Sequence, residues 1–206
     1  MKKEAVLKIL FECAAAYKEN LVGRNLLFIC VDPQNRVSTL ETVFMATNFL
    51  HMTGVKFLTV PKMNARTFYD RCVGKYLRVE DFDLDPLGYT EVKLKVLPRL
   101  VTPNLSANMI GDYHSARPIL ETDKLAGNMH CCMGLVTNFS QAPYYSPNSV
   151  LATDIRELAS DRVRIIATYR KYAKEKQYSE LVYVAKKVDW AKINYPPDFL
   201  YLDKPA

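Results

Sequence analysis

The hydrophobic pattern changes its period early in the chain, and this change limits the fold more than any other feature of the sequence. Apolar residues recur every three to four positions over 3–20, which predicts an amphipathic helix. Two runs rich in bulky and β-branched residues follow at 25–31 and 37–46. The turn-forming residues 32–36 between them predict a β-hairpin. The chain therefore begins as a helix followed by antiparallel strands.

The remaining pattern gives helices first and strands afterwards. Asn64 is a candidate N-cap for a helix over 65–72, and Thr90 precedes a second helix over 91–101 that Pro98 is expected to kink or end. The elements expected after these are strands at 108–113, 119–122 and 131–137 with a turn at 126–128, a loop at 140–148, a helix at 154–160, and a hairpin of 163–172 with 181–185, for which a helix over 161–176 is the alternative. This order predicts an α+β fold with N-terminal helices and a mainly antiparallel β-sheet.

The length of 206 residues predicts a single domain over 1–206. Within it we expect a helical part and the hairpin in 1–60, helices in 64–101, and the core of the sheet in 108–188. Hydrophobic residues make up 49% of the chain and charged residues 24%, as in ordinary soluble proteins. No apolar run approaches the roughly 18 residues of a membrane span, so we expect no membrane partner.

The five cysteines indicate a reducing compartment, because their number is odd and their spacing is irregular. Cys13, Cys30 and Cys72 lie in apolar surroundings that are typical of buried thiols. The N-terminus leads into an amphipathic pattern and not into the apolar core of a signal peptide. We therefore predict a cytoplasmic protein.

Several enzyme classes are disfavoured because their motifs are missing from the sequence. The chain has no glycine-rich phosphate loop, no Gly-x-Ser-x-Gly elbow and no His-Glu-x-x-His pair. The run 130–132 (HCC) does not indicate zinc, because adjacent cysteines are poorly placed to bind one tetrahedral ion and no Cys-x-x-Cys pair exists. We expect neither a metal nor a cofactor, and any nuclease activity should be metal-independent.

The excess of positive charge is concentrated near the C-terminus. The chain carries a net charge of +6, and residues 156–192 hold ten lysines and arginines against five acidic residues. Tyrosines are interleaved with these cations, a composition that suits RNA because cations meet phosphates and aromatic faces stack on bases. A solvated basic surface is the simpler alternative.

The octapeptide 48–55 (NFLHMTGV) holds one of only three histidines in the chain. Its apolar residues predict a strand, on which alternation would place His51 and Thr53 on one face. Gly54 would let the chain turn directly afterwards. The alternative is a histidine that is hydrogen-bonded inside the core. On the first interpretation, an imidazole and a hydroxyl lie side by side at a sheet edge.

Metal-free RNA cleavage needs one group to take the proton of the ribose 2′-hydroxyl, another to protonate the leaving oxygen, and cations to stabilise the phosphorane. Candidates for these tasks are His51 and Thr53, the runs 111–114 (GDYH) and 122–128 (TDKLAGN), and Arg170 in the basic hairpin. Each run alone is weak, because such residues also occur as surface pairs, core tyrosines and turns.

Several of these blocks together resemble a known family. The blocks are 48–55 (NFLHMTGV), 93–98 (KLKVLP), 109–113 (MIGDY), 122–128 (TDKLAGN) and the hairpin 164–186. In this order, from about residue 8 to residue 188, they resemble the phage Barnase–EndoU–colicin–RelE-like nuclease domains. The resemblance implies a helical N-terminal part, a twisted antiparallel sheet and metal-free cleavage of RNA.

The resemblance also implies roles for individual residues. It makes His51 the general acid or base, Thr53 its neighbouring donor, and Lys124 the cation that stabilises the transition state. Tyr113 and Asn128 would position the substrate. Arg170 and Lys186 in the terminal hairpin would contact phosphates.

The sequence thus predicts a metal-independent endoribonuclease with RNA as its substrate. Its expected role is that of a phage-related toxin or conflict effector, with a protein inhibitor or a host protein as a second partner. One rival is an ADP-ribosyl- or RNA 2′-phosphotransferase-like enzyme, which also uses a strand histidine. Glu41 and Glu180 are candidates for the catalytic glutamate of such an enzyme, but neither lies in a recognisable motif. The other rival is a non-catalytic factor that binds nucleic acid or protein through its basic hairpin.

Overall fold

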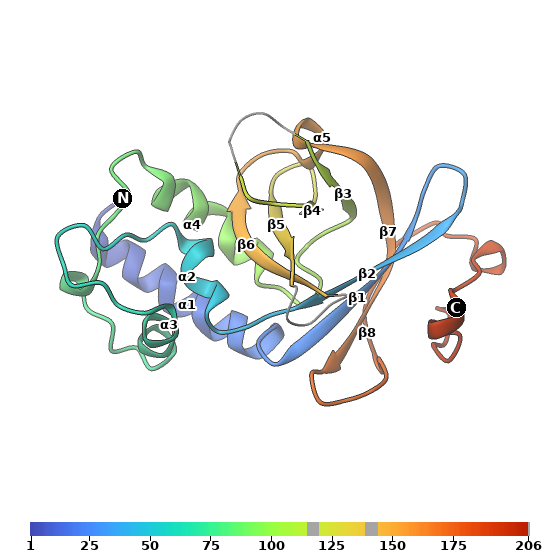
Figure 1. Cartoon of the computed structure of the whole chain (residues 1–206), viewed down its shortest axis with the longest axis horizontal. Coiled ribbons are helices and arrows are strands. Elements are labelled where there is room, and N and C mark those ends of the chain that lie inside the picture. The colour runs from blue at the N-terminus through green and yellow to red at the C-terminus, as the bar shows by residue number, and fades with distance from the viewer. Residues whose placement is uncertain (115–119, 139–143, 206) are drawn as a thin grey trace.

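A computed structural model describes residues 1–114, 120–138 and 144–205. The helices in these ranges are α1 (Lys3–Asn20), α2 (Asn48–Thr53), α3 (Ala65–Val73), α4 (Tyr89–Leu100) and α5 (Ile155–Leu158). The strands are β1 (Arg24–Val31), β2 (Val37–Val43), β3 (Met109–Tyr113), β4 (Lys124–Gly127), β5 (Cys132–Thr137), β6 (Tyr145–Leu151), β7 (Ala159–Tyr172) and β8 (Glu180–Val184). Figure 1 shows α1 to α4 gathered beside the strands, with α5 at one end of β7.

The sheet closes on itself. Its strands follow the order β1-β2-β6-β5-β4-β3-β7-β8, and β1 also pairs with β7. This additional pairing turns seven of the strands into a barrel. Neighbours pair in antiparallel fashion except β2 and β6, which run parallel and meet through the single pair Thr42 and Tyr145. The barrel is therefore mixed.

The predicted fold class, an α+β fold with N-terminal helices and an open, mainly antiparallel twisted sheet, is therefore wrong. The reason is β7, a strand of 14 residues that pairs with other strands along both of its edges. One edge pairs with the whole of β1, while β3 and then β8 share the other edge. Because each end of the strand order meets this long strand, the sheet curls into a barrel.

One hydrophobic cluster joins the helices to the interior of the barrel. It contains inward-facing residues of the strands, such as Phe28 and Leu135, together with helix residues such as Tyr17 and Phe49. Helices α2 and α4 contact β6, next to the seam where β2 and β6 barely touch. The helical layer thus fills the side of the barrel that the strands leave weakest.

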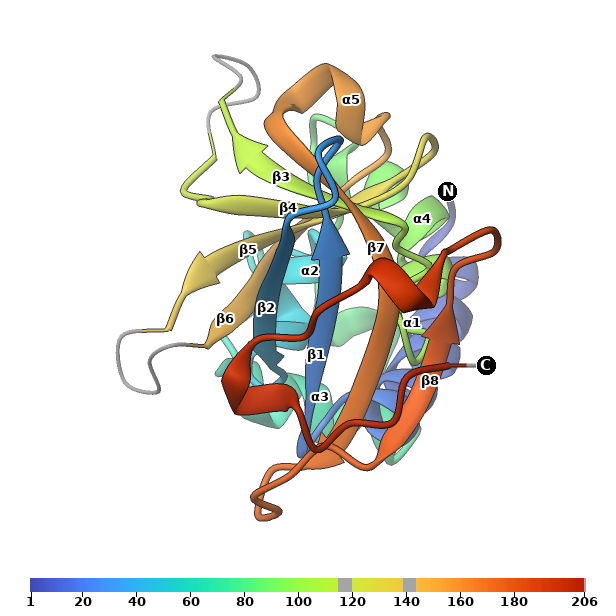
Figure 2. The ribbon, with the colours of Figure 1, turned by 90° about the vertical axis from the view of Figure 1, so that its right-hand side faces the viewer.

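The C-terminal segment covers the outer face of β1 and β7 (Figure 2). Ile193, Tyr195 and Leu202 pack there, on outward-facing residues of the two strands. The Tyr169 hydroxyl donates to the backbone oxygen of Asp203 at 2.7 Å. This segment gives the two strands a second packed face, so β1 and residues 165–169 of β7 are buried on two sides.

Many of the predicted elements are confirmed. The helix over 3–20, the strand at 25–31 and the terminal hairpin are present, and the alternative helix over 161–176 is wrong. Asn64 caps α3 as expected, because its side chain accepts a hydrogen bond from the Thr67 N–H at 2.7 Å. Helix α4 extends two residues beyond Pro98, so the proline does not end it.

Other predicted elements are wrong or shorter. The octapeptide 48–55 forms no strand, because its residues 48–53 are helix α2. Strand β2 ends at Val43, and the helix predicted at 154–160 is only α5. The turn at 126–128 begins too early, because β4 runs to Gly127. Residues 120–122 are not a strand, and 145–148 belong to β6 and not to a loop; residues 119 and 140–143 of those predictions lie outside the described ranges.

All five cysteines are free and buried, which confirms the predicted burial of Cys13, Cys30 and Cys72. Burial raises the pKa of the Cys13, Cys30, Cys72 and Cys132 thiols to about 12. Thiols with such pKa values stay protonated and unreactive at neutral pH. In the described part of the chain, none of the helices has both the length and the apolar character needed to cross a membrane.

Candidate functional site

Helix α2 exists because its two ends and one face are fixed. The Asn48 side chain accepts a hydrogen bond from the Met45 N–H at 2.9 Å before the first turn. Gly54 ends the helix in the left-handed conformation with φ 68°, which costs a glycine little. Phe49 and Met52 are fully buried, one turn apart. Helical spacing then turns His51 to the opposite, exposed face.

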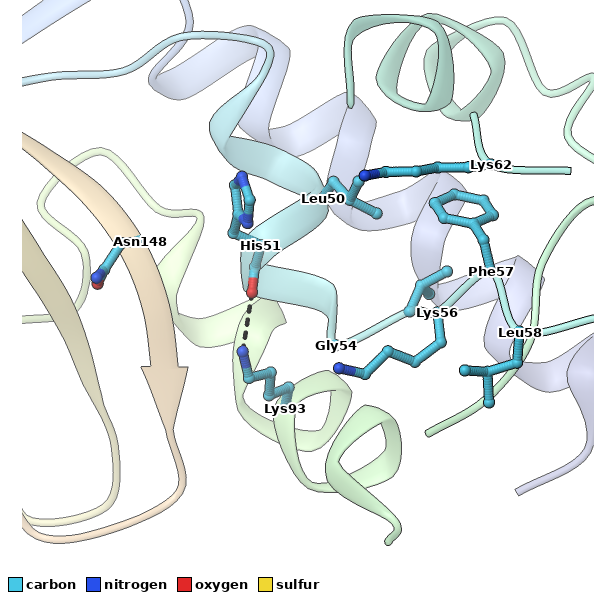
Figure 3. Close-up of a pocket in the computed structure, with 10 residues that line it drawn as sticks. Leu50, His51, Gly54, Lys56, Phe57, Leu58, Lys62, Lys93 and Asn148 are labelled. Atoms are coloured by element: carbon cyan, nitrogen blue, oxygen red, sulfur yellow. Dashed lines mark hydrogen bonds between the residues drawn. The ribbon is translucent and has the colours of Figure 1, made fainter. Parts of the chain in front are cut away.

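His51 lines a cleft of about 520 Å³ between the helical layer and β6 (Figure 3). The cleft is also lined by Leu50, Gly54, Val55, Lys56, Phe57, Leu58, Lys62, Lys93 and Asn148. Among these described residues three are lysines and none is acidic, so the cleft is suited to an anion. Leu50, Phe57 and Leu58 add apolar surface to the lining. The cleft thus combines an imidazole, three amines and an apolar surface.

The His51 imidazole is open to solvent. Within the described ranges no group hydrogen-bonds either ring nitrogen, so both are available to a ligand. The backbone of the same residue is engaged, since its carbonyl accepts a hydrogen bond from Lys93 Nζ at 2.8 Å. The side chain is therefore free to react while its position on α2 is fixed.

Lys93 is the most perturbed cation of the cleft. Burial and, to a lesser extent, the nearby charge of Lys56 lower its pKa to about 8, against an opposing effect of Asp85. The Lys93 amine lies at the C-terminal end of α2, where a positive charge is favourable. A lysine that titrates this near neutral pH can both carry a charge and give up a proton.

The other two lysines differ in their surroundings. Lys56 Nζ lies 3.4 Å from Asp85 Oδ2, whereas Lys62 is exposed and has no ion-pair partner among the described residues. In Figure 3, Lys56 and Lys93 approach Gly54 from two sides, and Lys62 reaches toward Leu50. The Asn148 side chain points away from His51 and accepts a hydrogen bond from Thr122 Oγ1 at 2.9 Å. The lysines, and not Asn148, are therefore the polar side chains best placed to contact a ligand in the cleft.

Asp83 holds the cleft wall made by residues 56–59. Its carboxylate accepts hydrogen bonds from the Leu58 N–H at 2.7 Å, the Thr59 N–H at 2.8 Å and the Thr59 hydroxyl at 2.7 Å. Its backbone pairs with Lys56 in both directions. The hydrogen bonds from Thr59 and Leu58, with the charge of Lys3, lower the Asp83 pKa to about 2 against the cost of burial.

Asp83→Asn should therefore make the protein less stable at neutral pH. Because the pKa of this carboxyl is lowered on folding, its contribution is complete above its ordinary value near 4 and disappears as the pH falls to about 2. The difference in the free energy of unfolding between wild type and variant should shrink over that range, as measured by urea titration. Asp198→Asn, on the exposed C-terminal segment, should show no such change. A difference that stays constant with pH would contradict this role.

Thr53 does not lie beside the His51 imidazole. Its side chain is fully buried, because on a helix residues two apart face different directions. The Thr53 hydroxyl donates to the Leu50 carbonyl at 2.8 Å and accepts from the Val55 N–H at 3.2 Å. It therefore closes the end of α2.

Tyr113 and Lys124 come together on β3 and β4, but the residues that line the His51 cleft do not include them. Lys124 pairs across the strands with Asp112 and forms an ion pair with it. The Tyr113 N–H donates to the Asp123 carbonyl at 2.9 Å. The structure thus groups these two residues at the end of the barrel where β3 ends and β4 begins.

The other three predicted residues lie elsewhere on the barrel. Asn128 shapes the turn after β4, donating to the Ser106 carbonyl at 2.8 Å and accepting from the His130 N–H at 2.7 Å. Arg170 forms a bidentate ion pair with Glu180 at 2.7 and 2.5 Å. Lys186 is exposed and lines a second hollow of about 580 Å³ with Arg164 and Tyr183.

Sequence reasoning missed the three lysines of the cleft. Lys56 directly follows the block 48–55, and Lys93 begins the block 93–98, so both were adjacent to or inside segments already singled out. Nothing in the local pattern showed that these blocks meet in space. The helical spacing of Phe49 and Met52 was the one signal that could have identified α2 and its exposed histidine.

Comparison with known proteins gives one match. A family model described as phage-Barnase-EndoU-ColicinE5/D-RelE like nuclease4 matches residues 9–187, a stretch that contains the whole cleft and the barrel. No curated protein and no solved structure matches the chain.

Proposed function

The chain belongs to the phage Barnase–EndoU–colicin E5/D–RelE-like nuclease family 4, and from this we propose that it is an endoribonuclease whose active site is the His51 cleft. A nuclease of this type acts on a nucleic acid. The single observation that supports the assignment is an exposed imidazole in a cleft with three lysines, with no hydrogen-bond partner for its ring nitrogens among the residues that the structure describes.

The proposed reaction is transesterification at a ribose 2′-hydroxyl. His51 takes the proton of the hydroxyl as its oxygen attacks phosphorus and the bond from phosphorus to the 5′-oxygen breaks. Lys93 gives a proton to the leaving oxygen, a task that suits an amine with a pKa of about 8. Lys56 and Lys62 stabilise the charge of the phosphorane. The products are a 2′,3′-cyclic phosphate and a free 5′-hydroxyl.

We propose further that the reaction needs no metal ion. The cleft offers an imidazole and three amines, which are the groups that acid–base transesterification uses. Hard cations such as Mg²⁺ instead prefer carboxylate ligands. In the described ranges no group of three or more histidine, cysteine, aspartate or glutamate side chains is arranged to hold a metal. This donor set favours acid–base chemistry in the cleft.

RNA cleavage in the presence of EDTA tests this proposal. We expect single-stranded RNA to be cut into fragments with cyclic phosphate and 5′-hydroxyl ends, which mass spectrometry identifies. An otherwise identical oligonucleotide of deoxyribose should remain intact, because it has no 2′-hydroxyl. Cleavage that requires a divalent cation, or that proceeds equally on DNA, would rule out the mechanism.

Residues outside the cleft are proposed as contacts to more distant parts of the RNA. Lys186, with Arg164 and Tyr183, fits a phosphate contact because all three border one hollow. Tyr113 and Lys124 are proposed as a second contact to the RNA. The Lys124 amine already forms an ion pair with Asp112. A role as a phage-related toxin follows from the same activity, and it predicts growth arrest on expression that His51→Asn relieves.

A further inference from the structure

Tyr89 is an exposed aromatic residue beside the cleft. Tyr89 is 54% exposed, so its ring is accessible to a ligand. It is the first residue of α4, four positions before Lys93. Residues four apart on a helix are neighbours on one face, so Tyr89 and Lys93 lie on the same face of α4, one turn apart.

The start of α4 is fixed against the cleft. The Thr90 hydroxyl donates to the Gly54 carbonyl at 2.6 Å, and Asp85 just before the helix pairs with Lys56. Both Gly54 and Lys56 line the cleft. The start of α4, and with it the backbone of Tyr89, is therefore held against cleft residues by contacts that do not use the Tyr89 side chain.

We propose that Tyr89 stacks on a base of single-stranded RNA next to the nucleotide whose phosphate occupies the cleft; this inference rests on the proposed function. An aromatic face next to cations is the arrangement by which proteins hold single strands, because cations meet the backbone while the ring stacks on a base. In a duplex the bases are already stacked on each other and cannot reach such a ring. The cleft thus selects unpaired RNA.

Binding to a fluorescently labelled 2′-O-methyl RNA, which cannot undergo the reaction, tests the stacking directly. Because a base gains affinity by stacking on an aromatic ring, Tyr89→Ala should weaken binding of the single strand by about tenfold. Tyr89→Phe should restore it, because a ring without the hydroxyl still stacks. Tyr76→Ala is the matched control, since Tyr76 is 57% exposed but follows α3, where its ring lies against Gly74 and not at the start of α4. The same oligonucleotide annealed to its complement should bind more weakly.

On cleavable RNA, Tyr89→Ala should raise KM while kcat is kept, because the ring contacts a base and not the reacting atoms. Affinity that is unchanged in Tyr89→Ala, an equal loss in Tyr76→Ala, or equal binding of duplex and single strand would each overturn the stacking role. The binding assay is independent of catalysis. If the wild type failed to cleave RNA, the proposed function would be refuted, whereas the stacking role would still be decided by the binding assay.

Discussion

His51→Asn is expected to lower the rate of RNA cleavage by about 10²–10⁴-fold, the usual contribution of a positioned general acid or base. Asparagine keeps a polar side chain of similar reach but cannot accept and release a proton near neutral pH. The imidazole is exposed and has no hydrogen-bond partner among the described residues, so the fold should not depend on it. The free energy of unfolding should change by less than about 0.5 kcal/mol. Single-turnover cleavage and urea titration of the same preparation measure both quantities.

His130→Asn is the matched control for this experiment. His130 is also an exposed histidine, but it lies at the turn between β4 and β5 and does not line the cleft. Its variant should cleave RNA at the wild-type rate. If His51→Asn retained full activity, or if both variants lost activity equally, the cleft would not be the active site.

Phe49→Ala should lower the free energy of unfolding by about 3–5 kcal/mol, far more than any substitution on the surface of the protein. Phe49 is fully buried at the centre of an aromatic cluster, with ring centroids 5.5 Å from Tyr17, 5.6 Å from Tyr69 and 6.3 Å from Phe68. Truncation removes these contacts and leaves a cavity between three helices. For a chain of this length, the midpoint of thermal unfolding should fall by roughly 10 °C.

Leu200→Ala serves as the control for Phe49→Ala. Leu200 is 69% exposed on the C-terminal segment, so its truncation should alter the free energy of unfolding by no more than about 0.5 kcal/mol. Because Phe49 fixes α2, activity in Phe49→Ala should also decline at temperatures below the midpoint of unfolding. A loss of stability under about 1 kcal/mol would show that the cluster can collapse around the missing ring.

The local elements of the chain could largely be predicted, because they depend on hydrophobic period and on caps. Asn64 capped a helix as its position suggested, and the alternation of 163–172 marked β7 correctly. Residues 48–55 were misjudged, because a single short turn of helix contains the same apolar residues as a strand. Burial of Phe49 and Met52 against other helices decides between them, and that burial is a tertiary effect.

The closure of the sheet could not be predicted from pattern alone. The period of a strand shows which residues face the core but not which strand occupies each edge. Strand β4 is only four residues long and ends in Gly127, where a Cβ atom would lie 2.4 Å from the Cys131 carbonyl oxygen. A glycine in that position suggests a turn, whereas here it permits two strands to approach closely.

The site was predicted only in part for a similar reason. His51 was identified from its local surroundings, but its cationic neighbours come from other parts of the chain. Lys93, whose amine contacts the His51 carbonyl, lies 42 positions away in the sequence. Such a pair becomes visible only when α2 and α4 are packed together.

The C-terminal segment sets a physical boundary that differs from the family boundary. The family match ends at residue 187, yet Ile193, Tyr195 and Leu202 lie beyond it and cover β1 and β7. Truncation of the protein after residue 187 would expose the apolar outer surface of β1 and β7 to solvent, and exposed apolar surfaces promote self-association. Anyone who shortens this protein to its recognisable nuclease region should therefore expect inclusion bodies, and the natural place for a purification tag is the N-terminus.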